Sequence, residues 1–252
     1  AAPLPDEIRD AFAASKIAPS YFLASPLVEV SRRLSRRMVT AGEAGCLGDP
    51  SKNLAAVGAN EQAWQIGRCR KTVAVVTDRE PAGFHPPEEK WSQETVDALM
   101  HLRFSYLFSR LEDLKPDVLR EVPVAEGAPL VKINRRGSDG MALWVTEKLS
   151  APEAVSRLRS EFEWARVTNS LFGLTFSSRQ AQDASSAEVI AEITRLSQTD
   201  DVWTANLGQI AAWWNVRSQL IHGQSPRPED RERFAPVRLK VTAAGEVVAE
   251  AL

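Results

Sequence analysis

The chain has 252 residues, of which 44% are hydrophobic and 25% are charged, and its formal net charge is −2. This composition is that of a globular protein, and the length suits one α/β barrel or two small domains. The small net charge gives no long-range attraction for a phosphate backbone, so we expect no nucleic-acid partner. No apolar run approaches the ~20 residues that a membrane span needs, and no signal peptide is visible.

Helix and strand signals alternate along the first half of the chain. A helix is expected over residues 5–15, before the strand Ser20–Ala24. Leu27, Val30, Leu34 and Met38 then recur at spacings of three and four, which predicts one buried helix face. The further expected elements are a strand within 42–48, a helix over 60–76, the strand Gly83–His85, a helix with Ser92 as N-cap, and a strand over 105–108.

The second half continues the alternation. Ser150 and Glu153 form a capping-box pattern at the start of a helix. Strands are expected over 130–133, 171–176 and 202–205, and a helix over 209–215. Strands that alternate with helices of 10–15 residues indicate parallel βαβ units. Functional residues in such folds lie on loops at the carboxyl ends of the strands, so the segments that follow the predicted strands are the places to search.

The last thirty residues have a different pattern. Residues 226–233 carry two prolines and six charges, which is typical of a linker. Val237–Val241 then alternates apolar and polar residues, and a hairpin with residues 247–248 is expected. We therefore predict a main domain over 1–224, and a linker with the start of a β-rich segment over 225–252. Cys46 and Cys69 are too few for a disulfide framework, and both burial as free thiols and a bridge between them stay open.

Residues 83–90, with the run His85-Pro86-Pro87-Glu88-Glu89 after a short strand, resemble the third motif of the polysaccharide deacetylases of carbohydrate esterase family 4. Residues 19–23 are similar to the family's second strand, and residues 202–214 to its last βα unit. The three motifs occur in the family's order, and the resemblance covers roughly residues 4–222.

The resemblance implies a distorted (β/α)7 barrel whose members remove acetyl groups from N-acetylated sugars with a divalent metal such as zinc. An aspartate and two histidines would hold the metal, a second aspartate would act as base, and a late histidine as acid. The aspartate pair of the first motif would precede Leu4, so we expect the barrel to lack its first strand. The resemblance also implies a periplasmic or extracellular location. The absent first motif and the β-like tail favour a larger chain, with further domains possible beyond both ends of this sequence.

The family's histidines are missing from this sequence. An alignment on residues 41–42 puts Glu43 at the first histidine of the second motif, and Gly48 and Lys52 at the two metal ligands. Glycine offers no ligand, and a lysine ammonium repels a cation, so we expect no bound metal. The late histidine should follow residues 171–176, where Ser177 stands instead. The three histidines present are His85, His101 and His222, and none of them falls at these positions.

A different set of polar residues follows the predicted strands. His85, Glu88 and Asp139 are the candidates for catalysis, although carboxylates and one histidine could also form an unusual metal site. The loop 134–140 is either a sugar-binding loop or a plain turn. Aromatic rings suit the apolar faces of sugars, which makes exposed tryptophans candidate platforms. The predicted substrate-binding residues are Asp49, His85, Glu88, Asp139, Arg179, Trp144 and Trp203.

Three functions are compatible with these observations. The first is a catalytically inactive, polysaccharide deacetylase-like module that binds or scaffolds a polysaccharide or oligosaccharide in extracellular polysaccharide metabolism. The second is an active hydrolase that removes acetyl groups from an N-acetylated sugar through an unusual site. The third is a structural or protein-binding domain of a larger chain.

Overall fold

The computed structural model describes residues 12, 15, 17–40, 42–49, 53–110, 119–122, 130–135, 137–182, 186–200, 202–221, 237–241 and 247–251. The chain forms two compact units. The sheet unit comprises Ser20–Ser109, Leu119–Ile133 and Ala205–Leu252. The helical unit comprises Ala1–Pro19, Arg110–Val118 and Asn134–Thr204.

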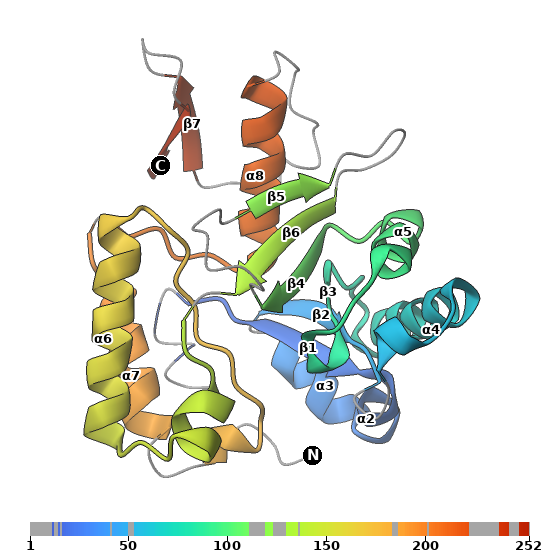
Figure 1. Ribbon diagram of the computed structural model, residues 1–252, viewed down its shortest axis with the longest axis horizontal. Helices are drawn as coiled ribbons and strands as arrows, with labels where there is room; N and C mark the ends of the chain where they lie inside the picture. Colours follow the sequence, from blue (N-terminus) through green and yellow to red (C-terminus); the bar gives the residue numbers. More distant parts are fainter. Residues whose placement is uncertain are drawn as a thin grey trace. The chain divides into compact units, whose positions relative to one another are not determined.

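The sheet unit is built on one six-stranded sheet (Figure 1). β1 to β4 pair in parallel, and β6 lies beside β4 with its arrow in the same direction. β5 is antiparallel to β6 at the edge. The strands, in their order across the sheet, are β1 (Ser20–Ala24), β2 (Glu43–Leu47), β3 (Gly83–His85), β4 (Tyr106–Arg110), β6 (Leu130–Arg135) and β5 (Leu119–Val122). The strands predicted in these segments are confirmed.

Helices connect the parallel strands and cover the sheet (Figure 1). They are α2 (Ser25–Val30), α3 (Arg32–Thr40), η1 (Leu54–Ala56), α4 (Ala59–Thr77), η2 (Pro87–Glu89), α5 (Gln93–His101) and, later in the chain, α8 (Leu207–Ile221). The core lies between this layer and the sheet, where Ile66 and Val73 of α4 pack with Phe84 and Leu107. Cys46 belongs to the same core.

Both cysteines are buried free thiols, which resolves the two alternatives left by the sequence. Cys69 lies on α4, and its Sγ is 3.4 Å from the carbonyl oxygen of Leu23. Burial raises the pKa of Cys46 well above its ordinary value, and the neighbouring Cys69 raises it further. Such thiols behave as small apolar side chains rather than as nucleophiles.

One predicted helix is in fact two. α2 ends at Val30, and α3 begins at Arg32 after Ser31, whose φ of −127° and ψ of 42° are not helical. The break changes which residues face the core, because Val28 and Val39 are buried while Val30 is 80% exposed. The expected buried position of Val30 was therefore wrong: a spacing of three and four extends one face only where the helix is continuous.

The inner face of the parallel strands is filled by aromatic rings that lie over two glycines. A Cβ atom on Gly45 would be 2.7 Å from Cδ1 of Phe22, and one on Gly83 would collide with the Tyr106 ring. Rings of Phe22 and Tyr106 are edge to face, 6.3 Å apart. Glycine is required at both positions because the space of a Cβ is taken by a ring.

The end of the chain forms a hairpin, as predicted. β7 (Val237–Val241) pairs antiparallel with β8 (Val247–Ala251). The predicted linker and the boundary at residue 224 lie outside the described residues, and so does most of the expected helix over 5–15. None of the helices in the described ranges has the length and hydrophobicity of a transmembrane span.

The helical unit packs two long helices around a small core. Its elements are η3 (Met141–Thr146), a π-helix, followed by α6 (Ala151–Val167), η4 (Gln180–Gln182) and α7 (Ser186–Leu196). The predicted capping box is present, since the Glu153 carboxylate accepts from the backbone N–H of Ser150 at 2.8 Å. Leu143, Leu158 and Val189 are fully buried between the helices.

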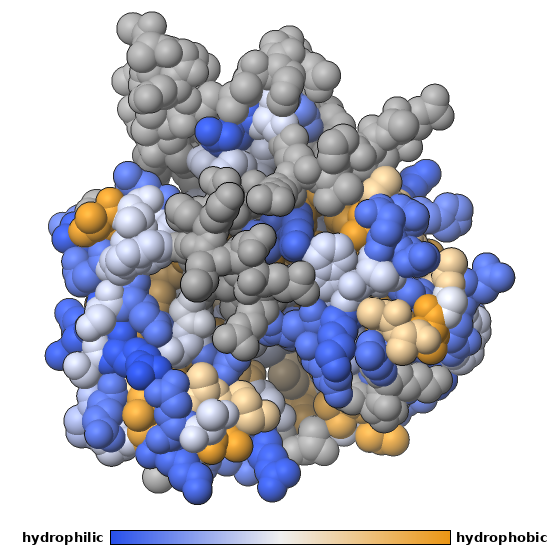
Figure 2. Space-filling view, in the orientation of Figure 1, coloured by the Kyte–Doolittle hydropathy of each residue, from blue (hydrophilic) through white to orange (hydrophobic). Residues whose placement is uncertain are grey.

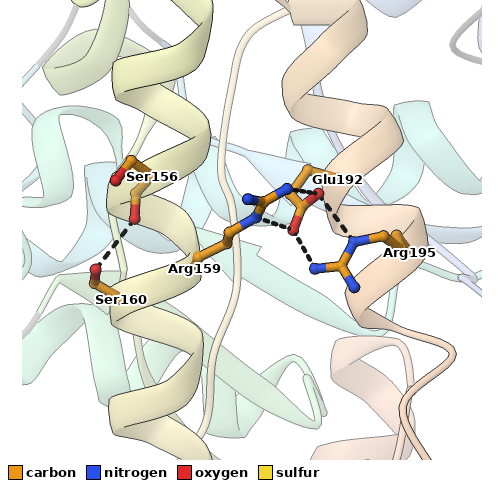
Figure 3. A network of polar contacts seen from close by, with 5 residues as sticks. All are labelled: Ser156, Arg159, Ser160, Glu192 and Arg195. Carbon is orange, nitrogen blue, oxygen red and sulfur yellow. Dashed lines mark hydrogen bonds and ion pairs between the residues drawn. The ribbon is translucent and has the colours of Figure 1, made fainter.

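An ionic cluster joins α6 to α7 (Figure 3). The Glu192 side chain is only 7% exposed and accepts hydrogen bonds from Arg159 at 2.7 and 3.0 Å. Arg195 donates to the same two oxygens at 3.1 and 2.6 Å. These two guanidinium groups lower the pKa of Glu192 to about 2. The carboxylate is thus held between two cations from different helices.

The expected strand over 171–176 is largely wrong. These residues are irregular, and a single parallel bridge joins Thr175 to Asp139. Phe172, Leu174 and Phe176 are partly buried against the core of the helical unit. The segment 202–205 is irregular as well. Apolar composition predicted the packing of these segments, but a strand also requires a neighbouring backbone with which to form a ladder.

Candidate functional site

The carboxyl ends of β2 and β3 lie side by side. Leu47 is paired with His85 in the parallel register, and the N–H of Gly48 donates to the carbonyl oxygen of His85 at 3.2 Å. Asp49 leaves the sheet one residue later. The two loops that carry the predicted residues Asp49, His85 and Glu88 therefore start from adjacent strands.

Gly48 is packed against the double-proline motif. A Cβ on Gly48 would lie 2.5 Å from Cδ and 2.7 Å from Cγ of Pro87, and 3.3 Å from Cζ of Phe84. Gly48 and Pro87 are both buried, and Phe84 is fully buried. Any side chain at position 48 would therefore have to displace a proline ring that rests on the core.

This packing bears on the metal that the fold implies. The resemblance places one metal ligand at Gly48, where the Pro87 ring fills the space of a side chain. The second ligand position, Lys52, lies outside the described residues. Ser177, at the position of the late histidine, accepts a hydrogen bond from the N–H of Gln180 at 3.2 Å and so begins η4. In the part of the chain that the structure describes, no group of three potential ligands could hold a metal. The residues present do not fit the family's metal.

His85 is held in one orientation. Its Nδ1 is 2.9 Å from the carbonyl oxygen of Phe108. A carbonyl only accepts, so Nδ1 carries the proton and the neutral ring has its lone pair on Nε2. The ring is half-buried, with the ring centroids of Phe22 and Phe108 at 5.3 and 5.5 Å. His85 is therefore a fixed imidazole at the end of a strand.

The acidic turn after His85 has an uncommon backbone. Glu88 and Glu89 have φ angles of 52° and 59°, in the left-handed region that non-glycine residues rarely occupy. Such residues cost about 1–3 kcal/mol each, and they cluster at functional sites. The Glu88 carboxylate is exposed and accepts from Nζ of Lys90 at 2.8 Å. Strained backbone thus lies beside the fixed imidazole.

Asp139 belongs to a firmly anchored loop of the helical unit. Ser138 is bound through its N–H and its hydroxyl to the Glu161 carboxylate, at 2.8 and 2.7 Å. Oδ1 of Asp139 accepts from the N–H of Ala142 at 2.6 Å, at the start of η3. The loop 137–140 is therefore a structural turn in its hydrogen bonding, and Asp139 orients the π-helix.

The other predicted residues of the helical unit differ in exposure. Trp144 is only 9% exposed, and its ring packs edge to face with Phe176 at 6.3 Å. Little of this ring is accessible to a sugar. Arg179 is exposed at the start of η4, and Trp203 is 41% exposed in the irregular segment before α8. Of the two tryptophans of this unit that were predicted to bind substrate, Trp203 has the accessible ring.

The predicted site divides between the two units. Asp49, His85 and Glu88 lie in the sheet unit, whereas Asp139 and Arg179 lie in the helical unit. The β2–β3 loops bring the first three into neighbouring segments. A common mouth for all five stays a prediction.

Sequence reasoning missed a polar cluster at the first residues of the strands. Glu43 accepts from the hydroxyl groups of Tyr106 at 2.5 Å and Ser20 at 3.2 Å, and Ser20 Oγ accepts from the N–H of Leu207 at 3.0 Å. A Cβ on Gly208 would collide with the Glu43 carboxylate. Burial, with Glu43 next in effect, raises the pKa of Tyr106 well above its ordinary value. Glu43 therefore fixes the start of α8 to the sheet. The sequence signal for this role was that a glutamate stands where the resemblance places a histidine.

Sequence comparisons give no family: no protein-family profile and no curated protein matches the chain. The fold, in contrast, matches solved structures closely. A protein from Mycobacterium smegmatis described as a polysaccharide deacetylase has a TM-score of 0.75 at 19% identity, over 88% of this chain and 78% of its own. An allantoinase has a TM-score of 0.69 at 18% identity, over 83% and 71%.

A third match is to a catalytically inactive relative of the enzymes. A carbohydrate esterase family 4 pseudoenzyme from Bacillus anthracis has a TM-score of 0.55 at 14% identity, over 82% of this chain and 59% of its own. Identities this low establish the fold alone. The chain has the α/β barrel fold of the polysaccharide deacetylases of carbohydrate esterase family 4, as its sequence motifs predicted.

Proposed function

We propose that the chain is a polysaccharide deacetylase-like domain that binds a glycan without deacetylating it, in extracellular polysaccharide metabolism. The observation that carries this proposal is the contact between Gly48 and Pro87, because it leaves no room for a side chain at a metal-ligand position. Deacetylation in this fold needs a metal to polarise the acetyl carbonyl. Binding of a sugar needs only hydrogen-bonding groups and an accessible surface.

The loops after β2 and β3 supply such groups. Asp49 and Glu88 can accept hydrogen bonds from sugar hydroxyls, and the Glu88 carboxylate is exposed. His85 can accept through Nε2, since Nδ1 is committed to Phe108. An inactive member of the fold has a precedent in the Bacillus anthracis structure, which is described as a pseudoenzyme.

A second candidate is a hydrolase that works without the family's metal. It is favoured by the likeness to an allantoinase at a TM-score of 0.69, which extends the fold beyond sugar substrates. His85 would then act as a general base, and Glu88, which follows the same strand, is a candidate for its partner. The substrate would be an N-acetylated sugar or another small amide.

One experiment separates these functions. The full chain is mixed with short N-acetylated oligosaccharides, with and without zinc, and both binding and acetate release are measured. We expect saturable binding and no acetate release, and we expect His85→Gln to weaken binding. If acetate is released and His85→Gln abolishes this release, the chain is a hydrolase and the proposed binding function is wrong. If neither oligosaccharide binding nor acetate release is detected, the third function, a structural or protein-binding domain, remains.

A further inference from the structure

α3 has an uneven distribution of charge. Four of its nine residues are arginines, none is acidic, and all four arginines are exposed. Arg37 lies in the last turn, where a cation is favoured by the helix dipole, but Arg32 and Arg33 lie in the first turn, where the dipole opposes them. Among the residues that the structure describes, these three arginines have no carboxylate partner. Neither the helix dipole nor an ion pair within the described residues therefore explains the arginines at positions 32 and 33.

Two contacts place α2 and α3 beside the neighbouring helix α4. Glu29, at the end of α2, is 3.3 Å from Arg68, and Arg36 donates from Nε to the carbonyl oxygen of Val76 at 2.6 Å. These two contacts place the end of α2 and the middle of α3 beside successive parts of α4.

The exposed row on α4 consists of Trp64, Arg68, Lys71 and Val75, at the spacings of four, three and four that form one helix face. Trp64 is 55% exposed, and the Arg68 guanidinium carbon lies 5.7 Å from the centroid of its ring. In Figure 2 hydrophilic residues alternate with small apolar patches over these helices.

We call this surface the basic face. It comprises Glu29, Arg32, Arg33, Arg36, Arg37, Trp64, Arg68 and Lys71. It has six cations and one carboxylate, in a chain whose formal net charge is −2. The positive charge is thus concentrated here, while the remainder of the chain is acidic.

We propose that the basic face binds an acidic polysaccharide, one that carries carboxylates on its sugar rings. Guanidinium groups match carboxylates with paired hydrogen bonds, and the exposed Trp64 ring offers a platform for the apolar face of a sugar. A membrane surface is less suited, because Trp64 and Val75 are separated along the exposed row of α4 by Arg68 and Lys71, and Val30 lies on another helix, so these side chains form no continuous apolar stripe. This surface is formed by the helices on the outside of the sheet, so it is distinct from the loops around His85 and does not depend on the function proposed for them.

The test is affinity electrophoresis of the full chain in gels that contain polygalacturonate, with neutral dextran gels as reference. We expect retardation in polygalacturonate only, and a loss of retardation as the salt concentration rises. The double variant Arg33→Glu/Arg37→Glu should weaken the apparent Kd about tenfold. Trp64→Ala should weaken it about three- to tenfold and leave the salt dependence unchanged.

The matched control is Arg103→Glu/Lys148→Glu, which makes the same change in net charge at exposed positions elsewhere. This control should be retarded like the original chain. The proposal is overturned by an absence of retardation, by an equal loss in the control, or by binding to phosphatidylglycerol vesicles or DNA in place of polygalacturonate. A loss of oligosaccharide binding in His85→Gln with polygalacturonate binding intact would distinguish the two sites.

Discussion

Replacement of Gly48 by alanine tests the packing that closes the metal-ligand position. The new Cβ would lie 2.5 Å from Cδ of Pro87, and Phe84 is 3.3 Å away on the same side. Overpacking of a buried site costs about 1–3 kcal/mol, and the alanine recovers about 0.4–1 kcal/mol by restricting the unfolded chain. We therefore expect a net loss of about 1–2 kcal/mol.

A loss of this size is measurable as a shift in the midpoint of urea or thermal unfolding. For a chain of this length each 1 kcal/mol lowers Tm by about 2–4 °C. Gly58→Ala is the matched control, because Gly58 has a φ of −70° and a Cβ there would meet nothing within 4 Å. It should leave Tm within about 2 °C of the original chain.

A double-mutant cycle identifies the cause of the loss. Pro87→Ala removes the ring carbons that Gly48→Ala would meet, so the double variant should be more stable than the sum of the two single effects by about 0.5–2 kcal/mol. If Gly48→Ala is neutral, or if the two effects simply add, then Pro87 does not fill the ligand position and the structural reason for excluding a metal is wrong.

Three further changes test other parts of the structure. Gly83→Ala should cost about 3 kcal/mol, because the Tyr106 ring occupies the place of the Cβ, and an unchanged unfolding midpoint would show that the ring lies elsewhere. Since the pKa of Glu192 is lowered to about 2, its carboxylate should stabilise the native state above about pH 4.5 and lose this effect as the pH falls toward 2; Glu192→Gln should flatten that part of the stability profile. Leu174→Ala should cost about 1–2 kcal/mol rather than the 2–5 expected of a core strand, because the side chain is only partly buried; a cost above 3 kcal/mol in urea unfolding would contradict this.

The sequence was a good guide where local signals agreed with tertiary structure. The strand Gly83–His85, the helix N-capped by Ser92 and the capping box at Ser150 were all predicted at their observed positions. Each has a local physical cause, such as a proline that ends a strand or a side chain that satisfies the first N–H groups of a helix. These signals are strong because they do not depend on distant residues.

Predictions that depended on distant partners were weaker. The apolar run 171–176 packs on the core, but it forms one bridge and no ladder, because Asp139 is its only partner among the described residues. The break at Ser31 could not be inferred from the spacing of the residues around it. The contact between Gly48 and Pro87 joins two loops that are 39 positions apart, so the missing ligand could be predicted from the sequence but the ring that fills its place could not.

Calorimetric titration of the full chain with zinc is the most direct test that the metal site of this fold is closed here. Because Pro87 occupies the side-chain space at Gly48, we predict no stoichiometric binding of zinc at the loops after β2 and β3. Binding of one zinc ion per chain that His85→Gln or Asp49→Asn abolishes would contradict this prediction, and with it the structural basis for a domain that binds a glycan without deacetylating it.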